Sequence, residues 1–433
     1  MSEHQPIRRA RTVGLIVAVC LVAANMRPTI TAIGPLLDQI GRDTGMALGT
    51  LGFITAVPLI AWAVVSPLAH GLSRRFGLSR VVLWALVLLA IGTAVRSLPG
   101  PATSLWIGTA LIGVALAIAN VLMPAAVKRD FSTARLTAMM AVYTALLGGI
   151  GAVSSGVVVP LSHLAEGGAG WRVALLVSGG ALLPLAIVVW AWAARDAGPT
   201  RVDAVHSARR GAGMRARDAG PTRRGAGIPR RGTGILRRGT GVWTDPLAWL
   251  VALYMGLQSC AFYMLVTWLA AISTSIGRSA VQAGFDVMFY QLLSLVGSLV
   301  LPAVLRGRAQ RWVPAAIPVL GAAGTVGLML APDAILVWVA ALGLFGGLSL
   351  AMALTLLAQR ARDHEAAAAL SGMAQSVGYL LAAIGPVAFG AAHAASGGWL
   401  GSLLLLLAVM LGLIVTGVSV GRDRFVLERA GRY

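Results

Sequence analysis

Twelve long apolar runs, most of them about 20 to 25 residues in length, constrain this chain more than any other feature. A helix of about 20 residues rises far enough to cross the roughly 30 Å hydrocarbon core of a bilayer. Strands of a membrane barrel would be shorter and would alternate between apolar and polar residues, which these runs do not. The runs are residues 13–36, 46–69, 81–99, 104–126, 136–160, 172–194, 246–275, 282–305, 312–331, 334–357, 367–392 and 399–420. The sequence therefore predicts an all-α membrane protein with twelve transmembrane helices.

The charged residues agree with this prediction in number and in placement. They make up only 12% of the 433 residues, whereas a soluble domain carries about a quarter. The formal net charge of +20 invites a nucleic-acid hypothesis, but the positive residues gather on the side of the predicted bundle that carries both termini. The exceptions are Arg27, Arg42, Arg96, Arg172 and Arg278. Because positive residues favour the cytoplasmic side, we expect both termini in the cytoplasm, the lipid bilayer as partner and no nucleic acid.

Residues 195–244 interrupt the series of apolar runs with a segment rich in arginine, glycine and proline. The motif RDAGPTR occurs in it twice, beginning at Arg195 and at Arg217. Such a composition cannot bury a core, so the segment is predicted to be a disordered cytoplasmic linker. Its arginines would lie against anionic headgroups, and a nucleic-acid or regulatory partner for it is the open alternative. On either side, residues 1–194 and 245–433 are predicted to form an N-terminal and a C-terminal six-helix bundle.

The two predicted bundles share an internal duplication. The stretch LTAMMAVYTALLGGIGAVSSG from Leu136 aligns without a gap on LSGMAQSVGYLLAAIGPVAFG from Leu370. Because both halves start and end on the same side, they are parallel repeats related by an axis along the membrane normal. Secondary transporters built in this way hold their substrate near the midplane, between the halves, and work by alternating access.

Arg27, in the stretch AANMRPTITAIGP, is a charge well inside the first apolar run. A cation at such a depth costs on the order of 3 kcal/mol unless it faces a cavity or a partner. Pro28 removes a backbone donor, so we expect the helix to kink or open beside the charge. A solute anion is one interpretation, and an internal ion pair or an arginine reaching the outer interface is the other. The second half has no basic residue at the equivalent place, near Ala261. A site with a single cation would suit a small anion, or a polar solute that needs one donor.

Other polar or aromatic residues at membrane depth complete the predicted substrate site, because such side chains tend to face the interior of a bundle. Each of them could equally well join two helices. Three aromatic residues would enclose a planar solute, four amides would donate hydrogen bonds, and one further tyrosine would line the site. These residues are Tyr263, Trp268 and Tyr379; Asn25, Asn120, Gln258 and Gln375; and Tyr143.

No pattern in the sequence points to an enzyme. The single lysine, Lys128, is not part of a phosphate-binding loop, and the six histidines fall in predicted loops or at helix ends rather than converging with carboxylates inside helices. We therefore expect no catalytic residue, no metal and no cofactor. Asp286, near the start of the eighth run, is the acid that could couple transport to protons. We expect the protein to be a monomer.

Four stretches resemble the cyanate permease and nitroimidazole transporter family of the major facilitator superfamily. They are NMRPTITAIGPLL, IANVLMPAAVKRDF, MGLQSCAFYMLVTWL and LSGMAQSVGYLLAAIGP. The resemblance covers essentially the whole chain except residues 195–242. It implies the major facilitator fold in a bacterial inner membrane and secondary active transport of a small solute, which the lone Arg27 indicates is anionic. Two alternatives remain open: an exporter of drug-like or nitroaromatic compounds, and a membrane sensor that uses the fold without transport.

Overall fold

The described part of the chain is helical throughout, with no strand. The computed structural model describes residues 4–165, 170–194, 241–306 and 310–427, so nearly all of the predicted linker lies outside it. Within these ranges, twelve segments are long and apolar enough to cross a membrane. The predicted all-α fold with twelve spans is therefore confirmed.

The first half of the chain supplies six spans, and the first and the last of them are interrupted. The elements are α1 (His4–Met26), α2 (Pro28–Thr31), η1 (Gly34–Leu36), α3 (Leu37–Thr44), α4 (Leu48–Phe76), α5 (Leu78–Ser97), α6 (Ala102–Asp130), α7 (Thr133–Ser162), α8 (Gly170–Gly180) and α9 (Leu183–Ala194). The first span comprises α1 to α3 and runs to Thr44, further than the predicted 13–36. The sixth is divided between α8 and α9, because Pro184 has no N–H to donate to the carbonyl of Gly180.

The second half supplies the other six spans. The elements are η3 (Val242–Thr244), α12 (Pro246–Ser275), α13 (Ala280–Val304), η4 (Gln310–Trp312), α14 (Val313–Leu330), η5 (Pro332–Ala334), α15 (Ile335–Gln359), α16 (His364–Ser396) and α17 (Trp399–Val420). The α12 helix begins cleanly at Pro246, because the Asp245 carboxylate accepts hydrogen bonds from the backbone N–H groups of Leu247 and Ala248. Most residues of α12 are buried on every side, as expected of a helix at the centre of a membrane bundle.

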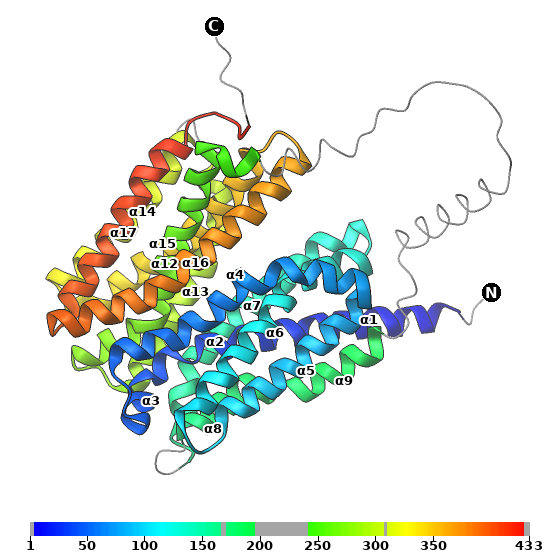
Figure 1. Cartoon of the computed structure of the whole chain (residues 1–433), viewed down its shortest axis with the longest axis horizontal. Helices are drawn as coiled ribbons and strands as arrows, with labels where there is room; N and C mark the ends of the chain where they lie inside the picture. Colours follow the sequence, from blue (N-terminus) through cyan, green and yellow to red (C-terminus); the bar gives the residue numbers. More distant parts are fainter. Residues whose placement is uncertain (1–3, 166–169, 195–240, 307–309, 428–433) are drawn as a thin grey trace, which may run out of the picture.

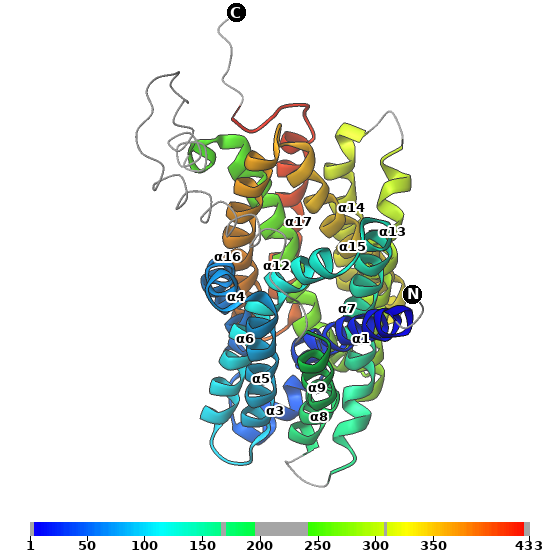
Figure 2. The same cartoon turned by 90° about the vertical axis from the view of Figure 1, so that its right-hand side faces the viewer.

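The two halves pack against each other at one end and spread apart toward the end that carries the termini. Figures 1 and 2 show α1–α9 grouped apart from α12–α17, with α4 beside α16 and α7 beside α13. In Figure 1 the ribbons of the two halves meet near α3 and diverge away from it. We refer to the end where they meet as the α3 end.

Glycines let the backbones of the two halves touch at the α3 end. A Cβ on Gly52 of α4 would lie 2.6 Å from the Pro386 carbonyl oxygen of α16, and one on Gly34 would collide with the Val266 carbonyl of α12. Hydrogen bonds between the halves lie in the same region. They include Thr267 Oγ1 to Thr55 Oγ1 at 3.2 Å, Thr274 Oγ1 to Asp38 Oδ2 at 3.4 Å and Gln291 Nε2 to Ser155 Oγ at 2.7 Å.

The duplication is visible as a matching contact in each half. Gly151 of α7 packs against the first span of its half, where an added Cβ would lie 2.8 Å from Cβ of Arg27. Gly385, its counterpart in the sequence alignment, packs against α12, where an added Cβ would lie 2.7 Å from Sγ of Cys260. The two halves therefore build the same approach of helices but place a cation in only one of them.

Candidate functional site

The first span is interrupted at Arg27, as the adjacent proline led us to expect. Arg27 lies between α1 and α2, and Pro28 has no N–H to donate to the carbonyl of Ala24. The far side of the break is tied to α7, because Thr31 Oγ1 donates to the Gly151 carbonyl at 2.8 Å and Ser155 Oγ donates to the Thr31 carbonyl at 3.0 Å. The neighbouring helix thus supplies polar partners for a backbone that is irregular at membrane depth.

The side chain of Arg27 lies among aromatic residues and is only partly buried. Its guanidinium carbon is 6.0 Å from the ring centroid of Phe262. The hydroxyl group of Tyr143 donates to Sδ of Met26, the residue before Arg27, at 3.6 Å, and Tyr263 follows Phe262 on α12. Among the residues that the structure describes, no carboxylate forms an ion pair with Arg27. The alternative of an internal ion pair therefore finds no support there.

A tryptophan from the second span joins the same aromatic group. The ring of Trp62, on α4, meets Tyr379 edge-on with centroids 5.2 Å apart and Tyr263 with centroids 6.5 Å apart. Phe262 in turn meets Tyr263 edge-on at 5.3 Å. The indole N–H of Trp62 is buried and has no hydrogen-bond partner, which is uncommon for a buried donor.

We call this group the Arg27 cluster, and both halves contribute to it. Its members are Arg27, Trp62 and Tyr143 from the first half and Phe262, Tyr263 and Tyr379 from the second. A cation, buried hydroxyl and indole donors, and ring faces and edges together suit a small planar solute that carries hydrogen-bond acceptors or a negative charge.

Three of the four amides predicted for the site form hydrogen bonds within their own helices. The Asn25 amide donates to the Leu21 carbonyl at 2.7 Å, one turn earlier in α1. The Gln258 amide donates to Ser259 Oγ at 2.7 Å within α12, and the Gln375 amide to Ser371 Oγ at 3.1 Å within α16. Asn120 is half-buried on α6.

Trp268 is fully buried inside the second half. Its indole N–H donates to the Pro386 carbonyl at 2.8 Å, and its ring lies 5.9 Å from the ring of Trp399. It therefore packs α12 against α16 and α17. Of the three predicted aromatic residues, Tyr263 and Tyr379 are brought together with Arg27, and Trp268 is not.

Two members of the cluster were not predicted from the sequence, Trp62 and Phe262. Both are apolar aromatic residues inside apolar runs, where they look like ordinary packing residues. Phe262 could have been found as the neighbour of Tyr263. For Trp62 the one available signal was its indole donor at membrane depth, which a count of polar residues passes over.

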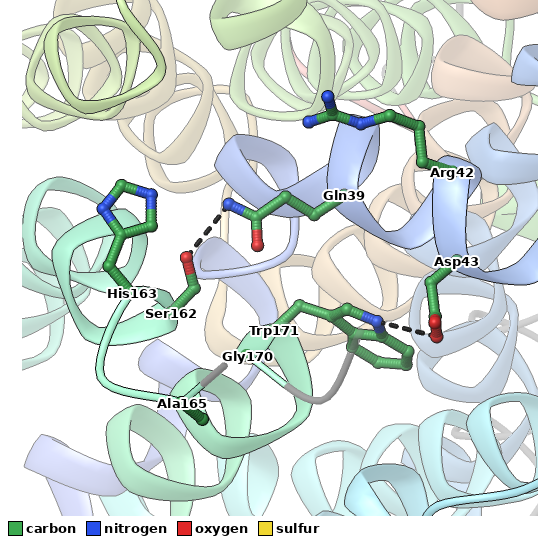
Figure 3. A pocket seen from close by; sticks show the side chains of 8 residues that line it. All are labelled: Gln39, Arg42, Asp43, Ser162, His163, Ala165, Gly170 and Trp171. Atoms are coloured by element: carbon green, nitrogen blue, oxygen red, sulfur yellow. Dashed lines mark hydrogen bonds between the residues drawn. The ribbon is translucent and has the colours of Figure 1, made fainter. Parts of the chain in front are cut away.

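A surface pocket lies at the α3 end of the first half, away from the cluster. It has a volume of about 590 Å³ and is lined by α3, the end of α7 and the start of α8. Its acid is already engaged, because Asp43 accepts from Trp171 Nε1 at 3.0 Å and pairs with Arg172 at 3.1 Å. Gln39 donates to Ser162 Oγ at 2.9 Å across the pocket (Figure 3). These contacts hold α3 against α7 and α8.

Asp286, the acid that could couple transport to protons, forms a bidentate ion pair with Arg278. Arg278 Nε and Nη2 donate to the two carboxylate oxygens at 2.7 and 2.8 Å, and Asp286 is 1% exposed. Both residues belong to the second half, so the pair joins the start of α13 to the loop after α12. In this conformation the carboxylate is fully used in a structural contact.

We expect Asp286→Asn to lower the thermal stability of the purified protein and to leave the pH dependence of uptake unchanged. The substitution removes one member of a charged hydrogen-bonded pair, which is worth about 1.5–3 kcal/mol. Thermal unfolding and uptake at several pH values measure the two effects. Asp333→Asn, at an exposed position of η5, is the control. A loss of pH dependence in Asp286→Asn alone would instead make Asp286 a proton-coupling residue.

The fold and the cluster between the halves define a membrane transporter, and comparison with known proteins identifies its class. The chain belongs to the Major Facilitator Superfamily, whose family model matches residues 15–386. Within that superfamily, the predicted resemblance to cyanate and nitroimidazole transporters is confirmed. The chain is 37% identical to the 2-nitroimidazole transporter of Escherichia coli (strain K12), over 95% of this chain and 96% of the relative.

A second curated relative and a solved structure agree with this assignment. The cyanate transport protein CynX of Escherichia coli (strain K12) is 26% identical over 95% of this chain and 98% of its own. A bacterial homologue of the human lysosomal transporter Spinster, solved in an inward-facing and unoccupied conformation, superposes with a TM-score of 0.74. It is 13% identical, over 96% of this chain and 99% of that one, so it supports the fold alone. The named relatives are transporters and not enzymes.

Proposed function

We propose that this transporter moves a small planar solute that carries a negative charge or strong hydrogen-bond acceptors, with Arg27 as its main charge contact. The observation that carries the proposal is an arginine without an ion pair in the described ranges, set among aromatic residues of both halves. A cation at this depth in the membrane is costly unless a cavity or a partner of opposite charge reaches it. A solute anion provides that partner, and the rings favour a flat one.

Alternating access follows from the placement of the cluster. Arg27 and Trp62 belong to the first half and Tyr263 and Tyr379 to the second, so a solute among them contacts both halves. When one half rocks against the other, such a site opens to one side of the membrane and then to the other. We propose residues 1–194 and 245–433 as the two moving units, joined by the linker at 195–244.

The charge pattern supports a location in the bacterial inner membrane with both termini in the cytoplasm. On that orientation the α3 end faces outward, and the ends of the halves that spread apart in Figure 1 face the cytoplasm. The Arg27 cluster would then exchange its solute with the cytoplasm in the conformation described above.

Flux measurements with purified protein test the proposal directly. The probes are cyanate, benzoate as a planar anion and 2-nitroimidazole as a neutral nitroaromatic compound, each radiolabelled and offered to proteoliposomes. We expect saturable flux of at least one probe above that of empty liposomes. Absence of flux for all three, in protein that is folded and binds none of them, would contradict the proposed substrate class.

Export of nitroaromatic compounds is the second candidate, and two observations favour it. The rings of the cluster suit an aromatic solute, and the relative that is 37% identical carries the name 2-nitroimidazole transporter. The same proteoliposomes separate the candidates, because a preference for 2-nitroimidazole over benzoate favours the exporter and the reverse favours an anion permease. A pH gradient of either sign then shows whether protons drive the flux.

We expect Trp62→Phe to weaken binding of the transported solute about threefold to tenfold. Phenylalanine keeps an aromatic ring against Tyr379 but removes the indole N–H, and one neutral hydrogen bond is worth about 0.5–1.5 kcal/mol. Calorimetric titration of the purified variant measures the dissociation constant. Trp84→Phe, at a half-exposed position on α5, is the matched control. Equal affinities in wild type and Trp62→Phe would remove Trp62 from the solute contacts.

A further inference from the structure

Arg96 is a second cation inside the first half, and neither the sequence nor the proposed function explains it. It lies in the last turn of α5 and is 0% exposed. None of the ion pairs in the described ranges includes it, and its Nε and Nη2 atoms have no hydrogen-bond partner. A fully buried guanidinium without an ion pair is costly, so the one side-chain hydrogen bond that Arg96 forms among the described residues bears on its role.

That contact is a hydrogen bond to the irregular part of the first span. Arg96 Nη1 donates to the Thr29 carbonyl oxygen at 2.6 Å. In an uninterrupted α-helix this carbonyl would accept from the N–H of Ile33. Here the N–H of Ile33 donates to the Ile30 carbonyl instead, at 3.2 Å, because the chain tightens toward the 3₁₀ turn η1. Arg96 therefore replaces the donor that the Thr29 carbonyl loses.

A glycine of the sixth span lets α8 pack closely against Thr29 and Arg96. A Cβ added to Gly179 of α8 would lie 2.9 Å from Cγ2 of Thr29 and 3.6 Å from Nη2 of Arg96. The short helix α2 is thus held by α5 and α8 through Thr29, and by α7 through Thr31.

The position of α2 is linked directly to that of Arg27. The backbone N–H groups of Ile30 and Thr31 both donate to the Arg27 carbonyl at 3.0 Å, so Arg27 is the first residue of this hydrogen-bonded turn. A shift of α2 would move the backbone from which the Arg27 side chain extends.

We propose that Arg96 is a positioning residue, which holds α2 in place and thereby sets the position of the Arg27 guanidinium. Arg96 does not touch the solute. It acts through the Thr29 carbonyl on the residue that does. The inference rests on the proposed function for its effect on solute binding, but the contact with α2 stands without it.

Arg96→Met and Arg96→Lys, compared with Arg172→Met, test this role. Methionine keeps much of the length and removes the donors, whereas lysine keeps the charge and one donor. Arg172 is the matched control because it is also buried, yet it pairs with Asp43 at the α3 end. We expect Arg96→Met to bind the transported probe about tenfold more weakly by calorimetric titration, because a displaced Arg27 would lose its charged hydrogen bond to the probe. Arg96→Lys should recover part of this loss, and Arg172→Met should bind as the wild type does.

Gly179→Ala provides a second variant in case Arg96→Met does not fold. It leaves every charge in place but pushes on Thr29, so it should also weaken probe binding. Wild-type affinity in whichever of the two variants fold would overturn the proposal. A purely structural role for Arg96 would lower thermal stability without changing the affinity of the folded protein.

Hydrogen exchange separates a failure of this inference from a failure of the proposed function. If wild-type protein binds neither benzoate, cyanate nor 2-nitroimidazole, the proposed substrate class fails, and exchange in peptides covering residues 24–36 still decides the role of Arg96. Faster exchange there in Arg96→Met than in Arg172→Met supports the hold on α2. Equal exchange in the two variants overturns it.

Discussion

Replacing Arg27 by alanine is expected to weaken solute binding about 10- to 150-fold and to reduce uptake to the level of empty liposomes. A hydrogen-bonded contact with a charged group is worth about 1.5–3 kcal/mol, which corresponds to that range of affinity. Arg27 has no carboxylate partner in the described ranges, so its loss leaves no unpaired acid behind. The ligand-free variant should therefore be as stable to heat as the wild type.

A thermal-shift titration with the transported probe measures both quantities in one experiment. Arg27→Lys retains the charge and should keep part of the probe-induced shift. Arg42→Ala is the matched control, because Arg42 is an exposed arginine of the same span, on α3, whose Nε donates to the Asp38 carbonyl. If the probe stabilises Arg27→Ala as strongly as wild type, Arg27 is not the charge contact.

The membrane makes most of this fold predictable from sequence. The bilayer sets a similar length for every span, and a backbone in lipid forms helices. The positions of the apolar runs in the sequence therefore located all twelve spans. The breaks depend on local chemistry. Pro28 and Pro184 each remove a donor, but whether a helix bends or divides there depends on the partners available nearby, such as Arg96, which donates to the Thr29 carbonyl. Those partners come from distant parts of the chain.

The candidate site could be predicted only in part, for a related reason. Arg27 stands out because a charge in an apolar run is rare, and tyrosines stand out for their hydroxyl groups. The direction in which a side chain faces is harder to predict for a helix such as α12, which is apolar on every side and so has no periodic pattern. Tyr263 and Trp268 are both on α12, yet one joins Arg27 and the other packs against Pro386.

Gly52→Val is expected to prevent the two halves from meeting at the α3 end and to reduce uptake strongly. An added Cβ would lie 2.6 Å from the oxygen and 3.0 Å from the carbon of the Pro386 carbonyl. Both are backbone atoms, which cannot rotate away as a side chain would. Overpacking of this kind costs about 1–3 kcal/mol, enough to shift a two-state equilibrium about 5- to 150-fold toward a conformation that is open at the α3 end.

Distances between spin labels on Arg42 and Asp333, both exposed near the α3 end, measure this shift. The labels require a background in which the free cysteines Cys20 and Cys260 are replaced. Gly49→Val is the matched control, because it adds the same side chain to the same helix at a position with nothing within 4 Å. We expect longer distances and slower uptake in Gly52→Val, and wild-type values for both in Gly49→Val. Wild-type distances in Gly52→Val would show that α4 and α16 need not touch at this glycine, and closure would then depend on the contact of Gly34 with the Val266 carbonyl.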